Sequence, residues 1–196
     1  MNNDIEIKLQ KLLNKRIEER AKNLDLLEKT VYLNHKLQSL NSDIEKKTVI
    51  GVVTQFNSLI TISEIEISAI LKGLCYSSDK WEKVFYLKTA SINIYETLET
   101  FKKYNQDLVN LSNKNNETKQ LLKDISVLIK NFRKRYEIDN KIKNIRNKTI
   151  GHIDKNMKVY YDLLQGLDFN ESIDMILSYN EITDRMLDLS IKLLDD

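Results

Sequence analysis

The chain of 196 residues contains no proline and only four glycines. Proline breaks helices because it lacks a backbone N–H and its ring clashes with the preceding turn, and glycine weakens them through its conformational freedom. A chain with so few interruptions can form long helices, whereas an all-β fold would need many more turn residues. Hydrophobic residues make up 41% of the sequence, which is too many for a disordered chain. We therefore expect an all-α protein.

Apolar residues recur at spacings of three and four along the whole chain, as on the buried face of a helix. The pattern predicts helices over residues 4–40, 44–74, 80–111, 154–165 and from 168 onward, and another that opens near residue 117. The apolar spacing of this last helix continues to Tyr136 and then shifts to Ile138, Ile142 and Ile145, which lead to Arg146. We expect an antiparallel bundle of four main long helices with one or two shorter ones. Because neither an internal repeat nor a Gly/Ser linker divides the chain, residues 1–196 are expected to form a single helical-bundle domain.

Polar residues mark several of the expected helix ends. Asp79 is followed three residues later by Glu82, and Asp168 by Glu171. An acidic or hydroxyl side chain in this position can accept hydrogen bonds from the first free N–H groups of a helix. We expect Asp79 and Asp168 to cap the helices that follow them.

Several kinds of site are excluded by what the sequence lacks. One cysteine and two histidines provide neither a disulfide framework nor a metal-binding motif, and the isolated glycines form no phosphate-binding loop. The aromatic residues Trp81, Phe85, Tyr86, Tyr95 and Tyr104 are interpreted as packing residues of the core and its rim. We therefore expect no metal and no cofactor.

The sequence also favours a cytoplasmic protein that does not associate with membranes. Its beginning lacks the basic region and apolar run of a secretory signal. The most apolar stretch, residues 56–74, carries Glu64, Glu66 and Lys72. Such a stretch is typical of a buried bundle helix and is too charged for a membrane span.

Positive charge is concentrated in one segment, although the chain as a whole carries only +2. Residues 130–158 contain ten basic and three acidic side chains. A charge run of this kind is either a solvated face or a binding site for a polyanion such as RNA. The candidate RNA-binding residues are Arg133, Lys134, Arg135, Lys141, Lys143 and Lys148.

Within this segment Arg146 and His152 are separated by five residues, at the point where a helical pattern meets Gly151. Arginine offers a fixed cation with donors suited to phosphate, and histidine can gain or lose a proton near neutral pH. On one continuous helix the two side chains would be rotated by about 240°, so a break at the glycine is needed to bring them together. Alternatively, Arg146 only stabilises its helix through a favourable interaction with the helix dipole, and His152 is a surface histidine in a turn.

The stretch from Ile145 to Asp154 resembles the R-x(4–6)-H signature of HEPN domains, including a polar residue, Asn147, after the arginine. This resemblance implies a mostly antiparallel helical bundle, often dimeric, that acts as a metal-independent endoribonuclease. It also implies that Arg146 binds the scissile phosphate, His152 is the acid/base and Asn147 orients one of them. Some toxin members continue His-x-Tyr, whereas this chain has His152, Ile153 and Asp154.

The sequence is therefore compatible with two functions. The first is an RNA-cleaving HEPN-type protein in a toxin–antitoxin or anti-phage role, with RNA, a second copy of the chain and a cognate antitoxin protein as partners. A dimer is expected because one histidine per chain is few for both an acid and a base. The alternative is a non-catalytic helical interaction protein, such as an antitoxin, an adaptor or a phage-encoded regulator.

Overall fold

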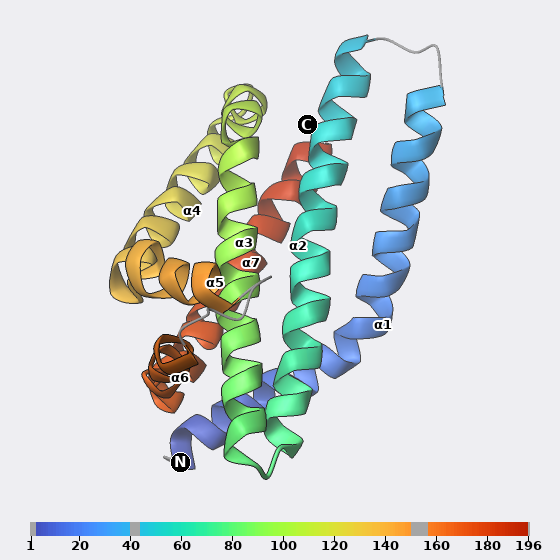
Figure 1. Ribbon diagram of the computed structural model, residues 1–196. Helices are drawn as coiled ribbons and strands as arrows, with labels where there is room; N and C mark the ends of the chain where they lie inside the picture. Colours follow the sequence, from blue (N-terminus) through green and yellow to red (C-terminus); the bar gives the residue numbers. More distant parts are fainter. Residues whose placement is uncertain (1–2, 40–43, 150–156, 196) are drawn as a thin grey trace.

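The computed structural model describes residues 3–39, 44–149 and 157–195 (Figure 1). These residues form α-helices and one π-helical turn, η1, and no strand. In chain order the elements are α1 (Asn3–Ser39), α2 (Ile44–Tyr76), α3 (Lys80–Ser112), α4 (Asn116–Arg135), η1 (Ile138–Ile142), α5 (Lys143–Thr149), α6 (Met157–Gln165) and α7 (Phe169–Asp195). The expected all-α bundle is confirmed, and five of the described helices have 20 or more residues.

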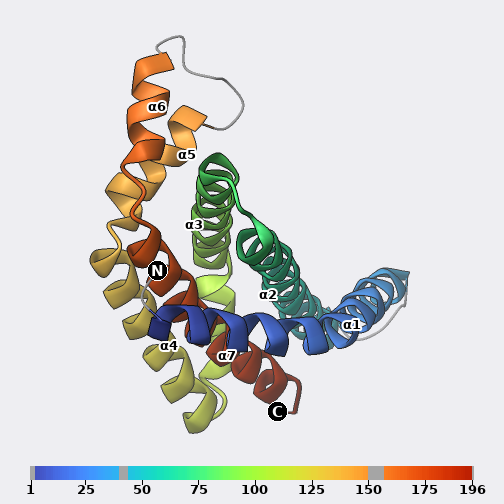
Figure 2. The same ribbon diagram turned by 90° about the horizontal axis from the view of Figure 1, so that it is seen from below.

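The long helices run alternately up and down the bundle (Figure 1). The first half of α1 crosses the lower end of the bundle, where it passes over α7 and α2, and its second half follows α2 (Figure 2). Helix α7 is the central element because it packs against α1, α2, α3 and α4. Its buried positions include Ile173, Ile176, Tyr179, Ile182, Met186 and Leu189, at the spacings of three and four that the sequence displays.

The expected caps are present. The Oδ1 atom of Asp79 accepts hydrogen bonds from the backbone N–H groups of Trp81 at 2.7 Å and Glu82 at 3.1 Å. Asp168 accepts in the same way from the backbone N–H of Glu171 at 2.7 Å. Each of these contacts satisfies donors that the first turn of a helix leaves free, which fixes where α3 and α7 begin.

Helix α4 ends where the apolar pattern of the sequence shifts. The structure has a break there at Glu137, whose φ of 49° and ψ of 41° are left-handed. The break allows Ile138, Ile142 and Ile145 to be buried in a new direction after Tyr136. As a result α5 lies against α3 instead of extending α4.

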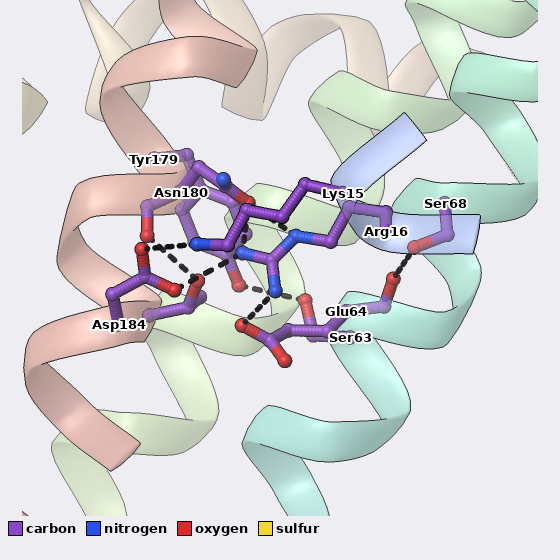
Figure 3. A network of polar contacts seen from close by, with 9 residues as sticks. Lys15, Arg16, Ser63, Glu64, Ser68, Tyr179, Asn180 and Asp184 are labelled. Carbon is purple, nitrogen blue, oxygen red and sulfur yellow. Dashed lines mark hydrogen bonds and ion pairs between the residues drawn. The ribbon is translucent and has the colours of Figure 1, made fainter. Parts of the chain in front are cut away.

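A buried polar cluster joins α1, α2 and α7 (Figure 3). The Arg16 side chain is only 2% exposed, and its Nη1 lies 2.9 Å from Oε1 of Glu64. Its Nε donates to Oδ1 of Asn180 at 3.1 Å, and its Nη2 donates to Oδ1 of Asp184 at 3.2 Å. A buried arginine is tolerated only when its donors are satisfied, so this cluster fixes how the three helices pack.

The apolar composition of the helices does not suit a membrane span. Among the residues that the structure describes, no helix combines the necessary length with sufficiently low charge.

Candidate active site around Arg146

Helix α5 holds Arg146 against the middle of α3. Ile145, which precedes it, is 1% exposed and anchors the short helix in the core. The Nε atom of Arg146 donates a hydrogen bond to Oε1 of Glu96 on α3 at 2.6 Å. The two side chains are 42% and 45% exposed, so the ion pair lies at the surface and can be reached from solvent. Glu96 therefore fixes the direction of the guanidinium group without enclosing it.

The outer edge of the Arg146 guanidinium remains open to a ligand. Its Nη1 donates to Oδ1 of Asn147 at 3.2 Å, and its Nη2 has no hydrogen-bond partner among the described residues. The hydrogen bond to Glu96 and the charge of that carboxylate raise the pKa of Arg146, so the side chain stays cationic. A guanidinium whose Nη atoms face outward can bind two oxygens of one phosphate.

His152, the predicted acid/base, lies outside the described residues, as does Gly151. Helix α5 ends at Thr149 and α6 begins at Met157, so the histidine belongs to the stretch between them. Its distance from Arg146 therefore stays a prediction.

A second arginine, Arg133, supports the same region from α4. Its Nη2 donates to Oε1 of Glu99 on α3 at 2.7 Å, and its Nε donates to Oδ2 of Asp139 in η1 at 3.0 Å. Burial acts to lower the pKa of Arg133, but the hydrogen bonds to Asp139 and Glu99 outweigh it and raise the pKa. Because only 10% of the side chain is exposed, Arg133 is positioned to hold α3, α4 and η1 together. RNA would have to displace these carboxylates to bind it.

The other predicted RNA-binding residues lie on the surface. Arg135 contacts Asp174 at 2.6 Å and Lys141 contacts Glu171 at 2.6 Å, both on α7. Such exposed ion pairs are weak and can be exchanged for contacts with a ligand. Lys134, Lys143 and Lys148 are exposed on α4 and α5. Arg135 and Lys141 thus lie against α7, whereas Lys143 and Lys148 share α5 with Arg146, and neighbouring carboxylates balance part of the charge of the segment.

An open groove of about 310 Å³ between α2 and α3 adjoins the site. Glu96 forms part of its wall together with Ile62, Glu66, Asn93 and Thr100. Asn93 donates a hydrogen bond to the Glu66 carboxylate across the groove. Glu96 thus contacts Arg146 on one side and borders an open groove on the other.

Sequence reasoning missed Glu96. It lies 50 residues before Arg146, so no local spacing connects the two. The sequence offers one indirect signal. Glu96 lies four residues after Ile92, on the same helical face as Trp81 and Phe85.

Comparison of the chain with protein-family models, with curated proteins and with solved structures found no match.

Proposed function

We propose that this protein is a metal-independent endoribonuclease of HEPN type. The observation that carries the proposal is the surface arginine, Arg146, whose guanidinium is fixed by Glu96 while its Nη2 remains unpaired among the described residues. An arginine held in this way is preorganised to bind a phosphate, which reduces the cost of ordering it when RNA arrives. His152, six positions after Arg146, would supply the acid/base group that the reaction also needs.

In the proposed reaction the 2′-hydroxyl of the RNA is the nucleophile. Its oxygen forms a bond to phosphorus while the bond from phosphorus to the 5′-oxygen breaks, which leaves a 2′,3′-cyclic phosphate and a 5′-hydroxyl. His152 accepts the 2′-proton, and the protonated His152 of a second copy of the chain donates a proton to the 5′-oxygen as it leaves. Arg146 offsets the charge that develops on the phosphate oxygens, and Asn147 orients the guanidinium.

The proposed biological role is that of a toxin or anti-phage protein in the cytoplasm. Its proposed partners are RNA, a second copy of the chain and a cognate antitoxin protein. A two-fold dimer would bring two copies of His152 into one cleft, one for each proton transfer. The helix that carries Arg146 supports RNA as the ligand, because Lys143 and Lys148 are both exposed on it.

Cleavage of total RNA by the purified protein in excess EDTA tests the proposal. We expect cleavage products with 2′,3′-cyclic phosphate ends, and we expect His152→Ala to abolish them. His35, which is exposed on α1, provides the matched control, so His35→Ala should cleave as the wild type does. Cleavage that survives in His152→Ala, or that requires Mg²⁺ or Mn²⁺, would contradict the mechanism.

The role of Arg146 is tested by one variant at that residue and one control variant at another arginine. Arg146→Ala should lose cleavage while it keeps the wild-type helicity and melting temperature, because the Arg146 side chain is half-exposed. Arg185 is exposed on α7, and Arg185→Ala should remain active. Equal activity of the two variants would remove Arg146 from the reaction.

A second candidate is a non-catalytic helical interaction protein, and an exposed stripe on α1 favours it. Ile17, Leu24 and Val31 recur every seven residues, and all three are exposed. An amphipathic helix of a partner could cover such a stripe. If this function holds, Leu24→Lys should abolish partner binding, and no RNA should be cleaved under any condition.

A further inference from the structure

One face of α3 leads from exposed aromatic residues to the candidate active site. Its members, at spacings of four, three, four and four, are Trp81, Phe85, Lys88, Ile92 and Glu96. These spacings keep the side chains on one side of the helix. The stripe begins in the first turn of α3 and ends at the carboxylate that holds Arg146. At 1.5 Å per residue it is about 22 Å long.

Helix α6 adds aromatic residues beside the beginning of this stripe. The rings of Trp81 and Tyr161 pack edge to face with centroids 5.7 Å apart. The Nζ atom of Lys88 lies 5.4 Å from the ring centre of Phe85 and 6.0 Å from that of Tyr160. A hydrogen bond of 2.9 Å from Lys80 to Gln165 also joins the two helices. Figure 1 shows α6 beside the lower part of α3, where that helix begins, and Figure 2 shows α6 next to α5.

These aromatic side chains are poorly covered. Trp81 is 48% exposed, Phe85 55% and Tyr161 49%. The sequence spacing alone predicts that Trp81 and Phe85 pack in the core or at its rim, but the structure places them outward. Exposed aromatic groups that cluster on one surface usually mark an interaction site.

We propose that this surface of α3 and α6, the aromatic track, binds single-stranded RNA. Unpaired bases would stack on Trp81 and Phe85, and the backbone phosphates would contact Lys88. Aromatic rings with nearby cations are the usual platform for single strands because every base has a face that can stack. The inference rests on the proposed function, since the track would deliver the strand to Arg146.

The charges along the track favour a nucleic acid over a protein partner. Residues 79–96 and 157–165 contain four lysines and four carboxylates. Two of these carboxylates already have partners, because Asp79 caps α3 and Glu96 pairs with Arg146. The cation at the rings is Lys88, which lies over both Phe85 and Tyr160. Positive charge beside aromatic rings complements a strand that has both phosphates and flat bases. The track length of about 22 Å corresponds to six or seven nucleotides at about 3.4 Å each.

Trp81 is the only tryptophan of the chain, so its fluorescence reports directly on the track. The probe is a 2′-O-methyl RNA of about twelve nucleotides, a length within the range of single-strand sites, which cannot be cleaved through a 2′-hydroxyl. We expect this single strand to quench the emission of Trp81. The same sequence paired with its complement should not, because its bases are already stacked.

Variants then locate the contact, with binding measured by anisotropy of the labelled probe. Phe85→Ala and Trp81→Ala should each weaken binding roughly tenfold or more, the usual effect of removing one stacking ring. Lys88→Gln should lower the log–log salt dependence by about 0.7. Tyr32, an exposed aromatic residue on α1, gives the matched control, and Tyr32→Ala should bind as the wild type does.

The inference is overturned if Trp81→Ala and Phe85→Ala bind the probe normally, or if the duplex quenches Trp81 equally. It is also overturned if these variants leave binding unchanged and convert a dimer into a monomer, because the track would then cover a second copy of the chain. Binding of the uncleavable probe requires no catalysis. Binding that depends on the track, without any cleavage, would therefore refute the proposed nuclease and leave the aromatic track standing. Cleavage by Trp81→Ala with an unchanged KM would refute the aromatic track and leave the nuclease standing.

Discussion

Glu96 and Glu99, three residues apart on α3, each bind an arginine from the segment after residue 130. Glu96 accepts a hydrogen bond from Arg146 at 2.6 Å, and Glu99 accepts one from Arg133 at 2.7 Å. The two carboxylates lie on neighbouring turns of one helix face, so they attach α4, η1 and α5 to a single support. The first pair is open to solvent, whereas the arginine of the second is nearly buried. We infer that Glu99 secures the segment and Glu96 aims the exposed guanidinium.

Glu96→Gln should separate these two roles. An amide cannot hold the Arg146 guanidinium as firmly as a carboxylate, so we expect RNA cleavage to fall by roughly ten- to a hundredfold, as for other displaced positioning groups. Helicity and melting temperature should stay at wild-type values because the pair lies at the surface. Single-turnover cleavage rates and thermal melts provide the two measurements. Glu181→Gln, an exposed change on α7, is the matched control. A cleavage rate for Glu96→Gln equal to that of the control would remove the positioning role.

Arg133→Met should instead lower stability, and its effect should depend on pH. Burial acts to raise the pKa of Glu99, but hydrogen bonds from Lys102 and Arg133 outweigh it and the pKa is lowered. The hydrogen bond from Arg133 also lowers the pKa of Asp139. Both carboxylates thus stabilise the fold above their ordinary values of 4.5 and 3.8, and this contribution is lost as the pH falls through their lower native values.

The free energy of unfolding, measured in urea from pH 7 to pH 3, checks this prediction. At pH 7 we expect Arg133→Met to be less stable by about 2 kcal/mol, because it leaves Asp139 unpaired and leaves Glu99 with Lys102 as its remaining ion-pair partner. The deficit should shrink towards pH 3, where the wild type also loses the pairs. Lys134→Met, one position along the helix and exposed, should match the wild type throughout. A deficit that stays constant with pH would show that packing, and not charge, explains the loss.

Glu137→Gly should stabilise the protein. Glu137 has a φ of 49°, a region that costs a residue with a Cβ atom about 1–2 kcal/mol and costs glycine nothing. The gain is partly offset by the greater freedom of glycine in the unfolded chain, so we expect a net increase of about 0.5–1 kcal/mol. Glu137→Ala keeps the unfavourable φ and should give no such gain. Urea midpoints of the three proteins measure the difference, and a gain shared by the alanine variant would point to charge instead of backbone conformation.

The helices of this fold were predictable because their causes are local. Asp79 and Asp168 cap helices through contacts two or three residues away, and the apolar spacing of α7 matches its buried face. The shift of the apolar pattern from Tyr136 to Ile138 marks the place of the break, but the left-handed turn at Glu137 was not predicted, since a left-handed glutamate has no residue-type signature. It depends on the burial of Ile138, Ile142 and Ile145 against other helices.

Only part of the candidate site was predictable, because some of its contacts join segments far apart in the sequence. The spacing of Arg146 and Asn147 to His152 is visible in the sequence, whereas the contact of Arg146 with Glu96 depends on the packing of α5 on α3. The exposure of Trp81 and Phe85 was missed as well, because an outward aromatic stripe and a buried one share the same helical spacing. Tertiary packing decides which of the two is present.

Tyr179→Phe should make the fold less sensitive to alkali. Tyr179 is buried on α7 and shares a hydrogen bond of 2.7 Å with Ser63, and burial raises its pKa to about 12 from 10.0. Above pH 10 the unfolded chain releases this proton while the folded protein keeps it, so wild-type stability falls by about 1.4 kcal/mol per pH unit from this group alone. Phenylalanine removes that loss but also removes a hydrogen bond, which costs about 1 kcal/mol at neutral pH. The unfolding free energies of the two proteins should therefore cross between pH 10 and 12.

Urea titrations at pH 8 to 11.5 measure this crossing, and the exposed Tyr32→Phe, as the control, should follow the wild type. Parallel profiles for Tyr179→Phe and the wild type would show that Tyr179 ionises equally in both states.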